Sequence, residues 1–198
     1  MAKSVPPQPD VLVLGEHPSA YLAAVLVHLT AKARVMHATI PGDEVDDRLV
    51  VVNPAFFSLH PSLEPLRRKL EMIGLYGLQF LSDDPATRSE HRSKSVLAHV
   101  VSYKALRAAM VKVAEAAGVD LVTPKVLDIE RLDERGIDVT INEKTQVRPK
   151  VLLVAGQLPE PQQKRLGLPE SWGAEVVHRY SYIKLPGKKW CDLGSDCA

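Results

Sequence analysis

Near its N-terminus the chain changes abruptly from a strand pattern to a helical one. The run DVLVL, residues 10–14, is almost continuously apolar, as strands buried on both faces of a parallel sheet are. Gly15 ends the run, and Pro18 stands where the first turn of a helix tolerates a missing N–H. A second strand pattern follows at RVMHATIP, residues 34–41. Strand, helix and strand within about 30 residues predict a right-handed βαβ crossover onto a parallel sheet.

The middle of the chain mixes several patterns. RLVVV, residues 48–52, predicts a strand, and a helix is expected from Pro61 or Ser62 to Gly74. The polar, aperiodic stretch 82–95 predicts a loop, and VLAHVVSY, residues 96–103, predicts a strand. Apolar residues then recur at helical spacing over 104–117, and Gly118 is a natural helix terminator.

Three strand-like runs follow, at 120–133, 136–142 and 147–156. The connection between the first two is too short for a parallel crossover, so they should pair antiparallel, whereas KVLLVAG has the pattern of a central parallel strand. The predicted fold class is α/β, with a Rossmann-like parallel sheet flanked by helices and an inserted antiparallel β-meander. Residues 1–9 are expected to be a disordered segment, 10–169 a dinucleotide-binding-like domain, and 170–198 the start of a further segment or a truncated tail.

Charge and cysteine content exclude several classes of function. The 25 basic and 24 acidic side chains nearly cancel, which argues against a nucleic-acid partner. Cys191 and Cys197 are too few for a disulfide framework, no histidine pair has metal-ligand spacing, and no apolar run resembles a signal peptide or a spanning segment. The expectation is a cytoplasmic protein with no metal and no integral membrane segment, whose partner is a small molecule of open identity and whose oligomeric state is open.

The turn after the first strand is a modified dinucleotide loop. The pattern G-x-G-x-x-G/A uses one glycine for the turn, one for the approach of pyrophosphate, and a small residue for helix packing. Gly15 fits the first role and Ala20 the third, but His17 replaces the second glycine. Protonated His17, with the Ser19 hydroxyl at the helix N-terminus, could bind a phosphate; the alternative is an ordinary loop.

Two further positions depart from a dinucleotide site. The carboxylate that would bind the ribose at the end of the second strand is replaced by Ala38 and Thr39. Tyr103, at the end of the strand before the long helix, could contact a ligand or could cover the core.

The order of these segments resembles the N-terminal part of FAD-dependent oxidoreductases of the glutathione-reductase-like fold, in the branch of p-hydroxybenzoate hydroxylase, geranylgeranyl reductases and flavin-dependent halogenases. The resemblance is carried by DVLVLGEHPSAYLAAVLVHL with ARVMHATIP, by SYKALRAAMVKVAEAAGVDLVTPKVLDIERLDERGIDVTI, and by RPKVLLVAGQLPEPQQKRLGLP. It implies FAD as the cofactor, with a degenerate motif and only the N-terminal portion of such a protein. The cofactor-binding positions that it implies are Gly15, His17, Pro18, Ser19, Ala20, Ala38, Thr39, Tyr103 (in place of a family arginine), Val126 (on the strand that passes the adenine) and Gly156.

Two functions remain open at this stage. The first is an FAD-dependent oxidoreductase, monooxygenase-like or reductase-like, or the dinucleotide-binding portion of one. The alternative is a degenerate, non-catalytic binding or assembly module that has lost FAD. An NAD(P)-binding Rossmann domain is a third possibility, disfavoured by the meander before KVLLVAG. No catalytic residue is identified.

Overall fold

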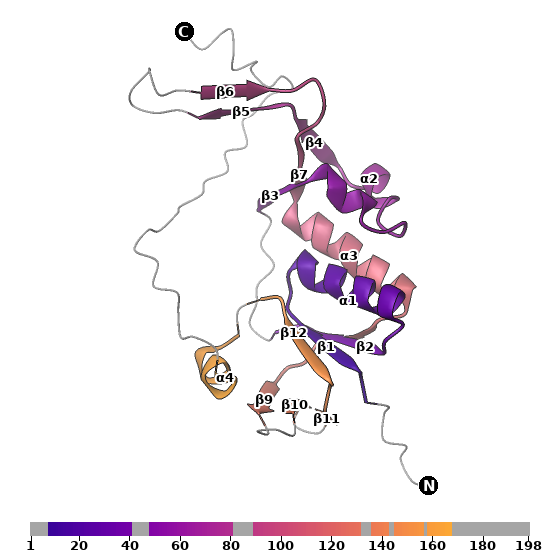
Figure 1. Cartoon of the computed structure of the whole chain (residues 1–198), viewed down its shortest axis with the longest axis vertical. Helices are drawn as coiled ribbons and strands as arrows, with labels where there is room; N and C mark the ends of the chain where they lie inside the picture. The colour runs from indigo at the N-terminus through magenta and orange to yellow at the C-terminus, as the bar shows by residue number, and fades with distance from the viewer. Residues whose placement is uncertain are drawn as a thin grey trace.

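A computed structural model describes residues 8–40, 48–80, 89–131, 136–142, 145–156 and 158–167 (Figure 1). The tails expected at 1–9 and 170–198, except for residues 8 and 9, lie outside the described residues, as do both cysteines. The centre of the molecule is a four-stranded sheet in the order β12-β1-β2-β8. All three strand pairings in it are parallel; its strands are β1 (Val11–Leu14), β2 (Val35–Ala38), β8 (Asp120–Val122) and β12 (Val151–Val154).

The residues of β1 alternate between two hydrophobic cores. Val11 and Val13 pack in a core with the helices α1 (Pro18–Ala31) and α3 (Tyr103–Ala117), whereas Leu12 and Leu14 pack against the β-meander. Because successive strand residues point to opposite faces, a strand covered on both sides needs the continuous apolar run seen in the sequence. The predicted α/β architecture with an inserted meander is confirmed, and the structure adds that α1 and α3 cover one face of the sheet while the meander covers the other (Figure 1).

The long helix α3 begins and ends at residues that the sequence makes suitable. Ser102 is the N-cap, and its hydroxyl accepts a hydrogen bond of 3.2 Å from the backbone N–H of Ala105. Gly118 has a φ of 85° and closes the helix, as predicted. Tyr103 is the first residue of α3 rather than the last residue of the preceding strand.

The β-meander is confirmed, with one correction. Strands β9 (Leu127–Arg131), β10 (Ile137–Ile141) and β11 (Thr145–Val147) form an antiparallel sheet in the order β11-β10-β9. The run 120–133 is not one strand, because β8 joins the parallel sheet before Pro124 and β9 begins only afterwards. The short helix α4 (Glu160–Arg165) lies against β9, where the Gln162 amide donates to the carbonyl of Leu127 at 2.6 Å.

The middle of the chain differs most from the prediction. The helix expected from 61 or 62 to 74 is reduced to α2 (Leu66–Lys69), preceded at 54–58 by the 3-10 helix η1 (Pro54–Ser58). Gly74 lies inside strand β4 (Met72–Leu75), which pairs antiparallel with β7 (Ala98–Ser102). Strand β7 is the central strand of this sheet, with β4 on one side and β3 (Leu49–Val52) on the other. The long-range partner β7 therefore draws these residues into a sheet. The described part of the predicted loop contains β6 (Ser89–Arg92), which pairs with β5 (Gly77–Phe80) as a hairpin.

Strand β12 is parallel, as expected, but it is not central. It pairs with β1 and stands at the edge of the sheet within the described residues. Val151 and Val154 are 47% and 39% exposed as a result. The apolar pattern VLLV identifies a strand of a parallel sheet, but nothing in it specifies the order of the strands.

Candidate functional site

The carboxyl ends of β1 and β12 lie side by side at the point where the strand order reverses. The chain leaves β1 through α1 toward β2 on one side, while β12 flanks β1 on the other. In open α/β sheets, ligands bind outside the carboxyl ends of the strands at such a switch point. Two loops follow these strand ends and begin at Gly15 and at Ala155, and we call the region beside them the switch crevice.

Gly15 is required by the protein's own backbone. Its φ is +145°, and a Cβ placed on it would lie 2.2 Å from the carbonyl oxygen of Ala155. Gly156 is also close, since a Cβ on that residue would lie 3.5 Å from the Cα of Gly15 and 3.3 Å from the Cδ1 of Ile40. The two loops therefore touch across the crevice, so this loop contact explains Gly15 without a ligand.

His17 caps the helix α1. Its Nδ1 accepts from the backbone N–H of Ser19 at 3.3 Å and lies 2.9 Å from the Ser19 hydroxyl oxygen, while Pro18 is the first helical residue. An Nδ1 that accepts leaves the ring proton on Nε2. The helix N-terminus thus already has one side-chain acceptor.

The same turn occurs a second time in the chain. At His60, Pro61 and Ser62, the Nδ1 of histidine accepts from the serine N–H at 3.2 Å and lies 2.9 Å from the hydroxyl oxygen. This second His-Pro-Ser turn lies between η1 and α2, elements that do not border the switch crevice. The geometry of His17 is therefore a local capping device that the sequence His-Pro-Ser adopts by itself.

Two rings and an arginine stand beside this cap. The ring centroids of His17 and Tyr103 are 5.5 Å apart, and the guanidinium of Arg48 lies 4.4 Å from the centroid of the Tyr103 ring. Burial, and then the positive charge of Arg48, lower the pKa of His17 below its usual value. In the free chain His17 is thus a neutral ring at neutral pH rather than an imidazolium.

A largely buried ion pair lies in the loop behind His17. Arg107 of α3 donates to the carboxylate of Glu16, and the side chains are 24% and 11% exposed. The Nε of Arg107 is buried without a hydrogen-bond partner in the described part of the chain. The guanidinium also lies 5.7 Å from the ring centroid of Tyr21, so α3 and the start of α1 are joined electrostatically next to the crevice.

The structure brings nine of the ten sequence-predicted site residues to this end of the sheet. Beyond the loop, Gly156 and Tyr103, the pair Ala38 and Thr39 ends β2, where the carbonyl of Ala38 accepts from the N–H of Gly15 at 3.1 Å. Both side chains are buried, at 0% and 5% exposure. A carboxylate in place of Ala38 would therefore lie inside the protein.

Val126 is the exception. It precedes β9 rather than lying on a strand, and its carbonyl accepts from the N–H of Asn142 at 3.0 Å. It is 46% exposed and lies beyond the end of β8, which is separated from β1 by β2. The expectation that Val126 sits on a strand is wrong, because Pro124 interrupts that run.

Sequence reasoning missed three charged residues of the crevice: Glu16, Arg48 and Arg107. Arg107 could have been found, because it lies one helical turn after Tyr103 and so shares its face of the helix. Glu16 lies inside the modified dinucleotide loop itself. Arg48 precedes β3, and nothing local in the sequence places it beside α1.

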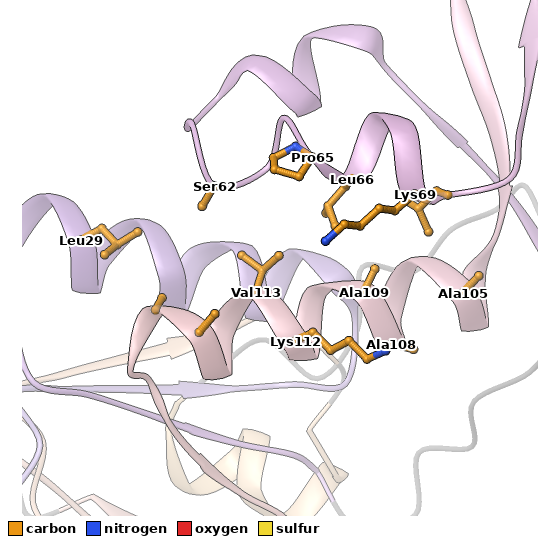
Figure 2. Close-up of a pocket in the computed structure, with 13 residues that line it drawn as sticks. Leu29, Ser62, Pro65, Leu66, Lys69, Ala105, Ala108, Ala109, Lys112 and Val113 are labelled. Atoms are coloured by element: carbon orange, nitrogen blue, oxygen red, sulfur yellow. The ribbon is translucent and has the colours of Figure 1, made fainter.

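The described residues offer neither a metal site nor a membrane-spanning helix. Among the described residues there is no group of three or more histidine, cysteine or acidic side chains suited to a metal ion. In the same part of the chain, no helix combines the length and the apolar character needed to cross a membrane. A cavity of about 580 Å³ lies between α1, α2 and α3, away from the switch crevice (Figure 2).

Comparisons with solved structures agree on the fold. PqsL, a probable FAD-dependent monooxygenase from Pseudomonas aeruginosa, matches 88% of this chain and 48% of its own, with a TM-score of 0.62 and 16% identity. A geranylgeranyl bacteriochlorophyll reductase-like protein from Thermoplasma acidophilum matches 81% of this chain and 42% of its own, with a TM-score of 0.58 and 15% identity. The flavin-dependent monooxygenase PieE, in complex with FAD and substrate, matches 83% of this chain and 33% of its own, with a TM-score of 0.58 and 16% identity.

The sequence itself matches no family model and no curated protein. The chain spans less than half the length of these structural neighbours. What it shares with them is the fold, in which a parallel α/β sheet carries helices on one face and an antiparallel meander on the other.

Proposed function

We propose that the switch crevice binds the ADP portion of FAD, and that the chain is the dinucleotide-binding part of a monooxygenase-like or reductase-like flavoprotein. The observation that carries this proposal is the position of two arginines at the switch point. Arg48 and Arg107 lie beside the N-terminus of α1, where Glu16 forms an ion pair with Arg107. Together with the partial positive charge of a helix N-terminus, this arrangement attracts an anion.

The residues present fit a pyrophosphate better than a ribose. The family arginine that Tyr103 replaces is compensated in space, since Arg48 covers the Tyr103 ring and Arg107 follows one turn later. The buried Nε of Arg107 is a further donor for which the described chain supplies no acceptor. No carboxylate ends β2, where Ala38 and Thr39 are buried, so the ribose hydroxyls lose a charged acceptor. A charge-assisted hydrogen bond contributes about 1.5–3 kcal/mol, so FAD should bind roughly 10- to 100-fold more weakly than with that acid in place.

In this proposal Gly15, Pro18 and Ala20 shape the turn, and His17 and Ser19 present their polar atoms at the helix end. Tyr103 lies beside His17 and Gly156 lies in the loop across from Gly15, whereas Val126 lies beyond β8, apart from these residues. When bound, FAD supplies the redox chemistry, and the protein supplies binding and orientation.

The second candidate is a non-catalytic binding or assembly module that keeps the fold without FAD. It is favoured by the His-Pro-Ser turn, because His17 already accepts a hydrogen bond from a backbone N–H of the helix and the identical turn at His60 forms outside the crevice. It is also favoured by Glu16, whose negative carboxylate would repel a phosphate.

A titration with FAD separates these candidates. The purified chain is titrated with FAD and with ADP by calorimetry, and its visible spectrum is recorded after gel filtration. We expect binding of both nucleotides that weakens with added salt. His17→Gly should tighten FAD binding about tenfold, because glycine admits the pyrophosphate and costs only a few tenths of a kcal/mol as an N-cap.

The matched control is His60→Gly, which removes the same turn elsewhere and should leave FAD affinity unchanged. Arg48→Gln should weaken both nucleotides about fivefold and reduce the salt dependence. If the folded chain and folded His17→Gly both fail to bind FAD and ADP, the flavin proposal is refuted and the second candidate stands.

A further inference from the structure

A groove on the outer face of the helical layer has the features of a ligand site. Its volume is about 580 Å³, within the range of small-molecule sites. The walls come from the end of α1, from α2 and the residues before it, and from one side of α3 (Figure 2). Leu66 and Val113 form its apolar floor, and alanines of α3 from Ala105 to Ala117 leave space along the helix.

The charge of the groove has one sign. Among the described residues that line it, Lys69 and Lys112 are the only charged side chains. Both are exposed, and no ion pair within the described part of the chain includes either of them. In Figure 2, Lys69 extends from α2 across the groove toward α3, and Lys112 lies along α3. An apolar floor beneath two amines without carboxylate partners is complementary to an amphipathic anion.

We infer that this groove binds a medium-chain fatty acid as its carboxylate. The stretch of α3 that lines it, Ala105 to Ala117, is roughly 18 Å long at 1.5 Å per residue, which suits an extended acyl chain. The acyl chain lies on Leu66 and Val113, and the carboxylate lies between the ammonium groups of Lys69 and Lys112.

The test uses laurate below its critical micelle concentration, measured by calorimetry on the full chain. We expect laurate to bind in a one-to-one ratio and lauryl alcohol, which has the same chain without the charge, to bind more weakly. The double variant Lys69→Gln with Lys112→Gln should lose at least tenfold in laurate affinity and keep its affinity for lauryl alcohol. Lys104→Gln is the matched control, because Lys104 is an exposed lysine of α3 outside the groove.

A second variant tests the apolar part. Ala108 lines the groove yet is exposed, so Ala108→Phe fills the space without entering the core, and it should block both laurate and lauryl alcohol. The inference is overturned if laurate does not bind, or if it binds equally well to the double-glutamine variant. It is also overturned if Ala108→Phe converts a dimer to a monomer in sedimentation while laurate binds nowhere, since the groove would then contact a second copy of the chain.

Discussion

Gly15→Ala is expected to lower the free energy of unfolding by about 3–5 kcal/mol, a large part of the total stability of a typical domain. Two effects combine at this residue. Its φ of +145° is unfavourable for any residue with a Cβ, and that Cβ would lie 2.2 Å from the oxygen and 2.8 Å from the carbon of the Ala155 carbonyl. The alanine methyl group can be accommodated only if the loops after β1 and β12 move apart. Urea unfolding followed by circular dichroism measures the loss.

Gly136→Ala provides the matched control for backbone strain. Gly136 has a similar positive φ of +111°, but a Cβ there would meet no atom within 4 Å in the described part of the chain. The control should cost about 1–2 kcal/mol, from the backbone conformation alone. Equal losses for the two variants would show that the loops do not touch as described.

Acidification from pH 6.5 to pH 4 is expected to destabilise the fold through His37 by up to about 3 kcal/mol. Burial lowers the pKa of His37 from 6.5 to about 4, and the side chain is 1% exposed beneath the ring of Tyr21, with centroids 4.1 Å apart. The unfolded chain takes up a proton below pH 6.5, whereas the folded chain resists protonation until about pH 4. The contribution of neutral His37 to the free energy of unfolding is therefore fully present above pH 6.5 and is lost progressively between pH 6.5 and pH 4.

His37→Phe keeps an aromatic ring against Tyr21 and removes the titration. The variant should lose most of the pH dependence between 6.5 and 4, measured as urea midpoints at several pH values. His17, whose pKa is also lowered, should contribute a smaller part in the same direction. The carboxylates with lowered pKa values, Asp10 and Asp138, stabilise the fold above pH 3.8 and lose that effect only in more acidic solution, so they do not obscure the result. A wild-type profile that is flat from pH 6.5 to 4 would contradict the burial of a neutral His37.

Local patterns in the sequence predicted the elements that need no distant partner for their identity. The crossover from β1 to β2, the helix ended by Gly118 and the meander follow from apolar periodicity and from terminating residues. The pattern failed where a partner far along the chain decides the structure. Residues 72–75 carry some helical pattern, but pairing with β7 makes them a strand, and the edge position of β12 depends on the order of the whole sheet.

The candidate site divides in the same way. Gly15 to Ala20 were predicted because they are contiguous, and Gly156 because its strand is recognisable. Arg48 was missed because it reaches the crevice only through the packing of another sheet on the helical layer. The His-Pro-Ser repeat was visible in the sequence, but its meaning required both copies in three dimensions, where their matching hydrogen bonds identify a helix-capping turn.

The parallel pairing of β1 with β12 also determines when the crevice can exist during folding. Val11 pairs with Val151, a separation of 151 − 11 = 140 residues, whereas β1 and β2 are joined by a single helix. The pairing of β1 with β2 can form from a short segment soon after that segment is synthesised. The pairing of β1 with β12 forms later, because closing so long a loop has a high entropic cost. Nucleotide binding would thus report on the last long-range step of assembly, and nascent chains that end before β12 should have α1 capped by His17 but no crevice beside it.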